Sequence, residues 1–81
     1  MARIEIYTTS FCPFCVRAKQ LLQSKNIPYV EHNMDGKDEE LTALKNRTGW
    51  RTVPQIFIDD ELIGGFTELA AKDARGELKG L

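Results

Sequence analysis

The residues with the clearest chemical potential are the chain's only two cysteines, Cys12 and Cys15, which enclose Pro13 and Phe14. Two thiols at this spacing suit a reversible dithiol/disulfide couple. The pair stands just ahead of a predicted helix, where free backbone N–H groups and the positive end of the helix dipole favour a thiolate. We therefore predict that Cys12 is the nucleophile and that Cys15, one turn into the helix, is the resolving thiol.

The cysteine pair has two plainer interpretations. The first is a pair of inert buried thiols, which the position at a helix start disfavours. The second is a metal site, but a lone Cys-x-x-Cys supplies two ligands where structural zinc usually takes four. His32 is the only histidine, and its setting is more typical of a solvated strand residue than of a ligand. We expect no metal site.

Two further motifs suit the binding of a peptide-like ligand. Pro54 follows Val53 at the start of an apolar segment, where a proline cannot donate to a sheet ladder. A cis peptide there would present the Val53 backbone to an extended ligand, although an ordinary strand-start proline is the alternative. Gly64 and Gly65 precede a predicted helix, which suits close approach of a carboxylate; the alternative is a turn with a helix cap.

The elements that must position these motifs follow from periodicity and from turn residues. Alternation and β-forming residues predict strands, and apolar residues three and four apart predict helices. The short Asp59-Asp60 connection predicts an antiparallel hairpin, whereas the first two strands should be parallel. The predicted strands are Arg3–Thr8, Tyr29–Met34, Val53–Ile58 and Glu61–Ile63; the predicted helices run from Pro13 to about Asn26, over Asp38–Thr48, and from a cap at Thr67 to about Gly76.

This β-α-β-α-β-β-α order predicts an α/β fold, a mixed four-stranded sheet flanked by three helices. The 81 residues, with a net charge of −1, fit one domain over residues 1–81. No basic surplus suggests nucleic acid, and no stretch approaches the ~20 apolar residues of a membrane span. The N-terminus has no signal-peptide pattern, so we expect a soluble cytoplasmic protein. We also expect a monomer.

In this order and spacing, the three motifs resemble those of the glutaredoxins. Cys12-Pro13-Phe14-Cys15 is similar to the family's Cys-Pro-Tyr-Cys, and Gly64-Gly65 matches its Gly-Gly before the last helix. The run from Thr48 to Pro54 resembles the family's Thr-Gly-x-Arg-Thr-Val-Pro, whose proline is cis. The resemblance covers essentially the whole chain and implies a thioredoxin-like fold, with glutathione as co-substrate and no tightly bound cofactor.

The resemblance also implies a set of glutathione contacts, with Cys12 forming the mixed disulfide. Three departures bear on the tightness of binding: Thr9 stands where many members carry lysine, Phe14 lacks a tyrosine hydroxyl, and Phe66-Thr67-Glu68 replaces the family's usual Cys-Asp-Asp or Cys-Ser-Asp after Gly-Gly. The implied contacts are Phe14, Arg51, Thr52, Val53, Pro54, Gly65, Phe66, Thr67 and Glu68.

The activity that the resemblance implies is glutathione-dependent reduction of protein disulfides and glutathionylated thiols. One rival is a redoxin of the same fold that takes electrons from thioredoxin reductase and serves ribonucleotide reductase, which makes that enzyme a candidate partner. The Trp50-Arg51 and Gly65-Phe66 pairs look slightly like that group. A rival from another class is a dimeric carrier of a glutathione-ligated [2Fe–2S] cluster, which Pro13 disfavours by resemblance.

Overall fold

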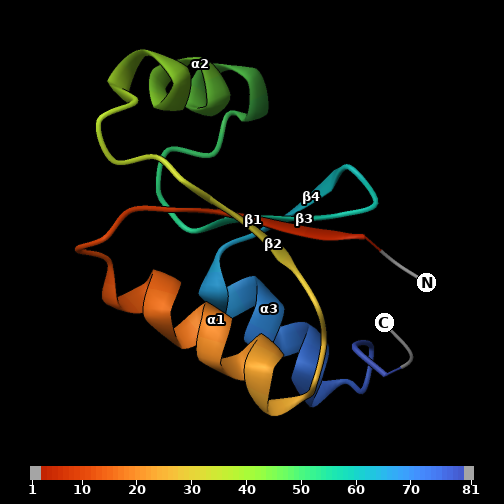
Figure 1. Cartoon of the computed structure of the whole chain (residues 1–81). Coiled ribbons are helices and arrows are strands. Elements are labelled where there is room, and N and C mark those ends of the chain that lie inside the picture. Colours follow the sequence, from red (N-terminus) through yellow and green to blue (C-terminus); the bar gives the residue numbers. More distant parts are fainter. Residues whose placement is uncertain (1–2, 80–81) are drawn as a thin grey trace.

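The computed structural model describes residues 3–79, which form four strands and three helices in the predicted order (Figure 1). Pro13 occupies the first helical position behind the N-cap Cys12, as the sequence predicts. Gly49 ends the second helix in a left-handed conformation, directly after the predicted last residue Thr48. The elements are β1 (Ile4–Thr8), α1 (Pro13–Ser24), β2 (Val30–Asn33), α2 (Asp38–Thr48), β3 (Gln55–Ile58), β4 (Glu61–Gly64) and α3 (Phe66–Ala74).

The strands form one mixed sheet in the order β2-β1-β3-β4. The pairing of β1 with β2 is parallel and that of β3 with β4 is antiparallel, both as predicted. Strand β3 also pairs antiparallel with β1, a pairing that was not predicted from the sequence. Asp59 and Asp60 both have positive φ angles, 50° and 66°, which is the backbone that a two-residue hairpin requires. The α/β class and the thioredoxin-like arrangement predicted from sequence are therefore confirmed.

The two faces of the sheet are covered unequally. Helices α1 and α3 lie side by side on one face, and α2 lies alone on the other (Figure 1). Alternate residues of β1 face opposite sides, so Ile4 and Ile6 enter the main core while Tyr7 lies on the α2 face, stacked on His32. The core between the sheet and the α1/α3 layer consists of Ile4, Ile6, Ala18, Leu22, Ile27, Ile56, Leu69 and Leu78.

Several predicted boundaries are wrong in ways that matter for the site. Strand β3 begins at Gln55, so Val53 and Pro54 belong to the preceding loop. Thr67 lies inside α3; the N-cap is Gly65, whose N–H is bonded by the Glu68 side chain. The helix begins earlier than predicted because the carboxylate of Glu68, the third residue of the helix, accepts from the Gly65 N–H, so the Thr67 hydroxyl is not needed as a cap.

The remaining boundary shifts are smaller. Helix α1 ends at Ser24, two residues before the predicted end, and β2 is shorter than predicted at both ends. Leu78 folds onto the core, whereas Leu81 lies outside the described residues. Within the described part of the chain, none of the helices is long and apolar enough to cross a membrane.

Candidate active site

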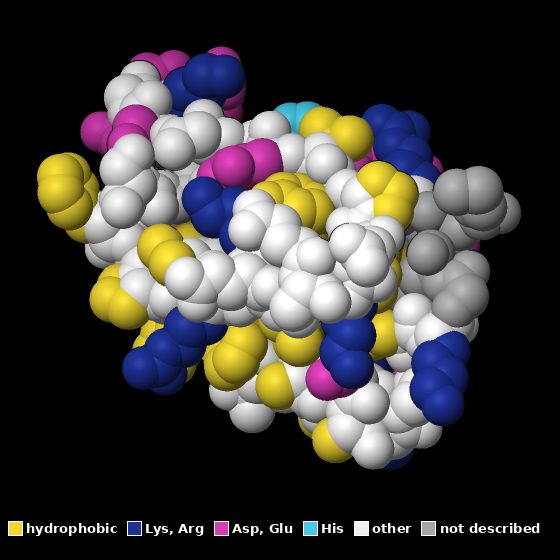
Figure 2. Space-filling view, turned by 60° about the horizontal axis from the view of Figure 1, so that its bottom comes forward, with side chains coloured by type: hydrophobic (Ala, Val, Ile, Leu, Met, Phe, Trp, Pro, Cys, Tyr) yellow, Lys and Arg dark blue, Asp and Glu magenta, His cyan; other side chains and the backbone are white. Residues whose placement is uncertain are grey.

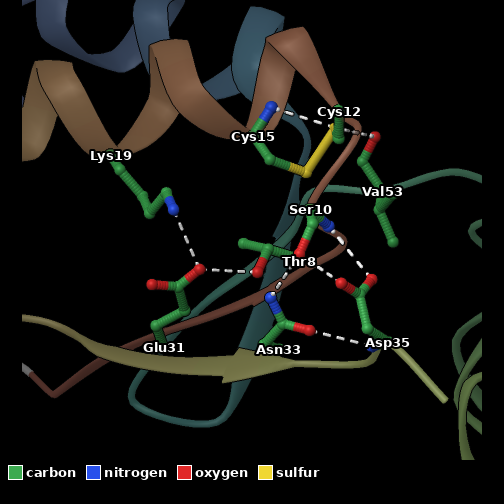
Figure 3. Close-up of a disulfide and its surroundings, with 9 residues drawn as sticks. All are labelled: Thr8, Ser10, Cys12, Cys15, Lys19, Glu31, Asn33, Asp35 and Val53. Atoms are coloured by element: carbon green, nitrogen blue, oxygen red, sulfur yellow. Dashed lines mark hydrogen bonds and ion pairs between the residues drawn. A yellow bond between two sulfur atoms is a disulfide. The ribbon is translucent and has the colours of Figure 1, made fainter. Parts of the chain in front are cut away.

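The two cysteines meet at the N-terminus of α1, where the structure holds them as a disulfide (Figure 3). Their Cα atoms are 5.2 Å apart. Cys12 is the N-cap, and the Cys15 backbone N–H donates to the Cys12 sulfur across 3.1 Å. Cys12 is partly exposed, whereas Cys15 is 1% exposed. An accessible sulfur that already accepts a hydrogen bond at a helix N-terminus is well placed to carry a thiolate charge.

The loop from Gly49 to Pro54 brings the Val53 backbone to the cysteines. Val53–Pro54 is a cis peptide, as the sequence predicts, and the Val53 carbonyl oxygen lies 3.7 Å from the Cys12 sulfur. Gln55, fully buried, fixes this loop: its Nε2 donates to the Trp50 carbonyl at 2.6 Å. The Thr48 hydroxyl, 3.1 Å from Gln55 Oε1, accepts from the Trp50 N–H. The loop is thus held by three partly buried hydrogen bonds that link Thr48, Trp50 and Gln55.

The start of α3 closes the third side of the site. Gly64 has a φ of 122°, and a Cβ there would lie 2.6 Å from the Glu68 side chain, so only glycine suits this close approach. Glu68 Oε1 accepts from the Gly65 N–H at 2.9 Å, which fixes the carboxylate beside the helix N-terminus. The Phe66 ring faces that of Phe14 from α1, with ring centroids 6.3 Å apart.

These three segments enclose a groove of about 210 Å³ beside the redox pair. Eight of the nine predicted glutathione contacts line it, and Trp50 joins them. Arg51 is the exception: it does not line the groove, and its guanidinium donates to Asn46 on α2 at 3.1 Å. The lining residues are Phe14, Trp50, Thr52, Val53, Pro54, Gly65, Phe66, Thr67 and Glu68.

The opposite side of Cys12 is formed by the loop after β1, which is tied to the loop after β2 (Figure 3). Asp35 accepts from the Ser10 N–H at 3.0 Å and from the Ser10 hydroxyl. Asn33 Nδ2 donates to the same hydroxyl at 3.3 Å, and its Oδ1 accepts from the Asp35 N–H at 2.8 Å. The bonds from the Ser10 hydroxyl and N–H hold the pKa of the Asp35 carboxyl below its usual range.

A second polar chain runs from α1 to β2 near the redox pair. The buried Thr8 hydroxyl donates to Glu31 at 2.7 Å, and Lys19 forms an ion pair with the same oxygen at 3.0 Å (Figure 3). These bonds, that from Thr8 foremost, lower the pKa of Glu31. Because Lys19 forms an ion pair with Glu31, its positive charge is largely neutralised and has little electrostatic effect on the cysteines.

Sequence reasoning missed the residues that position the site. Gln55 could have been noticed as the one polar side chain in an apolar strand, and Trp50 as a large aromatic next to the Thr52-Val53-Pro54 motif. Asp35 carried no such indication, because an aspartate before Gly36 is an ordinary turn residue.

A dithiol that closes at a helix N-terminus on a thioredoxin-like sheet makes this chain a thiol–disulfide oxidoreductase. Comparison with known proteins defines it further: the glutaredoxin family model matches residues 4–63. Glutaredoxin 3 of Escherichia coli is 50% identical over 78 residues, covering 96% of this chain and 94% of that protein. The chain belongs to the glutaredoxin family.

Solved structures agree with this assignment. Glutaredoxin 1 from Francisella tularensis, crystallised with cacodylate, has a TM-score of 0.81 at 41% identity over 98% of this chain and all of that one. A buckwheat glutaredoxin–glutathione complex has a TM-score of 0.88 at 30% identity, covering 95% of this chain and 73% of that one. Members of the family use glutathione as a substrate.

Proposed function

We propose that the protein reduces protein disulfides and glutathione mixed disulfides through Cys12 and Cys15, with glutathione as the electron donor. The observation that supports this most directly is the groove beside Cys12, which gathers eight of the nine residues expected to contact glutathione. The solved glutathione complex of a family member supports the same ligand. The whole chain, residues 1–81, would act as one domain.

The groove offers the groups that a γ-glutamyl tripeptide requires. The Val53 backbone lies beside the Cys12 sulfur, where it would pair with the cysteinyl unit. The first N–H groups of α3 lack partners within the helix and would receive the γ-glutamyl carboxylate. Glu68 uses one carboxylate oxygen on Gly65 and would offer the other to the γ-glutamyl ammonium group. Arg51 would have to leave Asn46 to reach the glycine carboxylate.

The reaction balances as a two-electron exchange. The Cys12 thiolate attacks one sulfur of the substrate disulfide, forms a mixed disulfide and releases the other sulfur as a thiolate. Cys15, as its thiolate, then attacks the Cys12 sulfur, which forms the intramolecular disulfide and frees the reduced substrate. One glutathione thiolate attacks the Cys12 sulfur, which forms a mixed disulfide on Cys12 and releases the Cys15 thiolate. A second glutathione thiolate attacks the glutathione sulfur of that mixed disulfide, which releases oxidised glutathione and the Cys12 thiolate. With a glutathionylated substrate, Cys12 alone takes the glutathionyl group.

A steady-state comparison tests the proposal. The protein would be given a glutathione mixed disulfide with glutathione, NADPH and glutathione reductase, and in parallel with NADPH and thioredoxin reductase. We expect turnover only in the glutathione system. Turnover only with thioredoxin reductase would overturn the glutathione assignment and indicate the redoxin that serves ribonucleotide reductase. We place the activity in the cytoplasm, where glutathione keeps thiols reduced.

A further inference from the structure

Exposed apolar side chains are concentrated around the redox pair. Of the four large hydrophobic residues exposed in the described part of the chain, three lie between positions 11 and 16: Phe11, Phe14 and Val16. The fourth, Val30, is the first residue of β2. It pairs with Glu5, near the end of β1 that lies away from the cysteines. Figure 2, which looks toward the α1/α3 side, shows hydrophobic side chains at the surface beside lysine and arginine. Clustered apolar exposure of this kind marks an interaction site.

Phe11 stands out within this cluster because it contributes nothing to the fold. Its side chain is 99% exposed, and it does not line the groove. Phe14, by contrast, is 52% exposed, faces Phe66 and carries the Arg17 guanidinium over its ring at 5.4 Å. Phe14 is therefore accounted for by the groove, and Phe11 is not.

The backbone that carries Phe11 is fixed on both sides. Ser10, just before it, is bonded to Asp35 through its N–H and its hydroxyl. Cys12, just after it, caps α1 and lies beside Val53. Met34 donates its N–H to the Thr8 carbonyl at 2.8 Å and ties the loop further. An aromatic side chain presented on a fixed backbone loses little additional freedom when a partner covers it.

Disulfide exchange dictates which partner arrives there. A substrate sulfur must approach the Cys12 sulfur, so whatever surrounds that sulfur on a large substrate must cover the neighbours of Cys12. A glutathionyl group fills the groove, on the side of Phe14 and Val53. A polypeptide is too large for the groove alone and would extend over the exposed neighbour of Cys12, Phe11. Aromatic side chains are enriched at the centre of such interfaces.

We propose that Phe11 is an anchor for protein substrates and selects disulfides with an apolar residue beside the cysteine. It would not affect small glutathione mixed disulfides. The inference rests on Cys12 as the nucleophile in the proposed function, but not on glutathione as the electron donor.

The test uses two cyclic disulfide peptides that differ only in the residue after each cysteine, leucine in one and serine in the other. Pre-reduced full-length protein is mixed with each peptide and the second-order rate constant of peptide reduction is measured, with no glutathione present. We expect the wild type to reduce the leucine peptide about tenfold faster, the order expected for partial burial of a Phe–Leu contact. Phe11→Ala should abolish that preference, and Phe11→Trp should retain it.

Val30→Ala is the matched control, because it shortens an exposed apolar side chain remote from the cysteines. It should keep the wild-type preference. An unchanged leucine-to-serine ratio in Phe11→Ala would overturn the anchor. So would an equal loss with both peptides, because this indicates a general defect at Cys12. If the wild type fails the glutathione assay but Phe11→Ala still loses the preference, the electron donor is wrong and the anchor stands.

Discussion

The two sides of Cys12 are held in place by different kinds of group. On the groove side, the buried amide of Gln55 bonds to the Trp50 carbonyl and fixes the loop that ends at Pro54. On the loop side, the exposed carboxylate of Asp35 bonds to Ser10. A buried neutral amide is insensitive to pH but costly to lose, whereas an exposed carboxylate titrates and is worth less. The side of Cys12 that would bind glutathione is thus held more strongly and less dependently on pH than the side that carries Phe11.

This difference fits the ligands that each side would receive. Glutathione is a constant partner, and a groove of fixed shape binds it with little ordering cost. Protein substrates vary, and a single projecting Phe11 makes few demands on their shape. The following substitutions separate the two sides, in order of decreasing effect.

Cys12→Ser should remove every activity, because Cys12 is the nucleophile for glutathione mixed disulfides and for protein disulfides alike. We expect turnover of glutathione mixed disulfides and of protein disulfides to fall to the rate measured without protein. Circular dichroism should show an unchanged fold, since a serine can cap α1 as the cysteine does. Residual turnover on either substrate would reverse the assignment of nucleophile and resolving thiol.

Cys15→Ser should separate the two substrate classes. Glutathione mixed disulfides need only Cys12 and the groove, so their turnover should stay within about threefold of wild type. Reduction of a protein disulfide needs the second thiol to release the substrate, so the variant should accumulate a mixed disulfide that mass spectrometry detects. Wild-type reduction of both substrates by this variant would show that Cys15 does not resolve the intermediate.

Gln55→Leu should damage the groove side alone. Leucine has about the size of glutamine but leaves the Trp50 carbonyl without its hydrogen-bond donor. This loss should lower the free energy of unfolding by about 1–3 kcal/mol. The loosened loop should raise the KM for a glutathione mixed disulfide more than it lowers kcat. Gln23→Leu is the control, because Gln23 makes an exposed hydrogen bond to Tyr29; its stability should change by less than about 0.5 kcal/mol. Equal effects of the two would deny Gln55 its positioning role.

The contrast between Gln55 and Asp35 also explains what could be predicted from the sequence. Helix and strand order and the β1–β2 and β3–β4 pairings follow from local patterns such as Pro13 and Asp59-Asp60. The cis proline at Pro54 follows from the resemblance to the glutaredoxins, because the local pattern also allowed an ordinary strand-start proline. The groove lining could be expected because its three motifs resemble those of the glutaredoxins. The groups that hold these motifs come from elsewhere in the chain and act through tertiary contacts.

Two details show where local patterns fail. Thr67 is a good capping residue, yet Glu68 reaches back to Gly65 and the helix begins earlier. Arg51 belongs to the motif, yet it extends toward α2 and bonds to Asn46. In both cases a side-chain contact that the linear pattern does not encode decides the outcome.

Asp35→Asn should have the smallest effect and should sharpen the comparison through pH. Because the folded-state pKa of Asp35 is lowered, its bonds to Ser10 contribute stability above the unfolded pKa of about 3.9. That contribution is lost as the pH falls through the folded value. Urea unfolding of wild type and variant between pH 7 and pH 3 should therefore show a difference that shrinks with acid. Turnover of glutathione mixed disulfides at pH 7 should not change.

The control is Asp60→Asn, which removes an exposed carboxylate in the β3–β4 turn. Its difference in stability from the wild type should not shrink as the pH falls. A constant offset between wild type and Asp35→Asn would mean that the charge of Asp35 does not hold the loop.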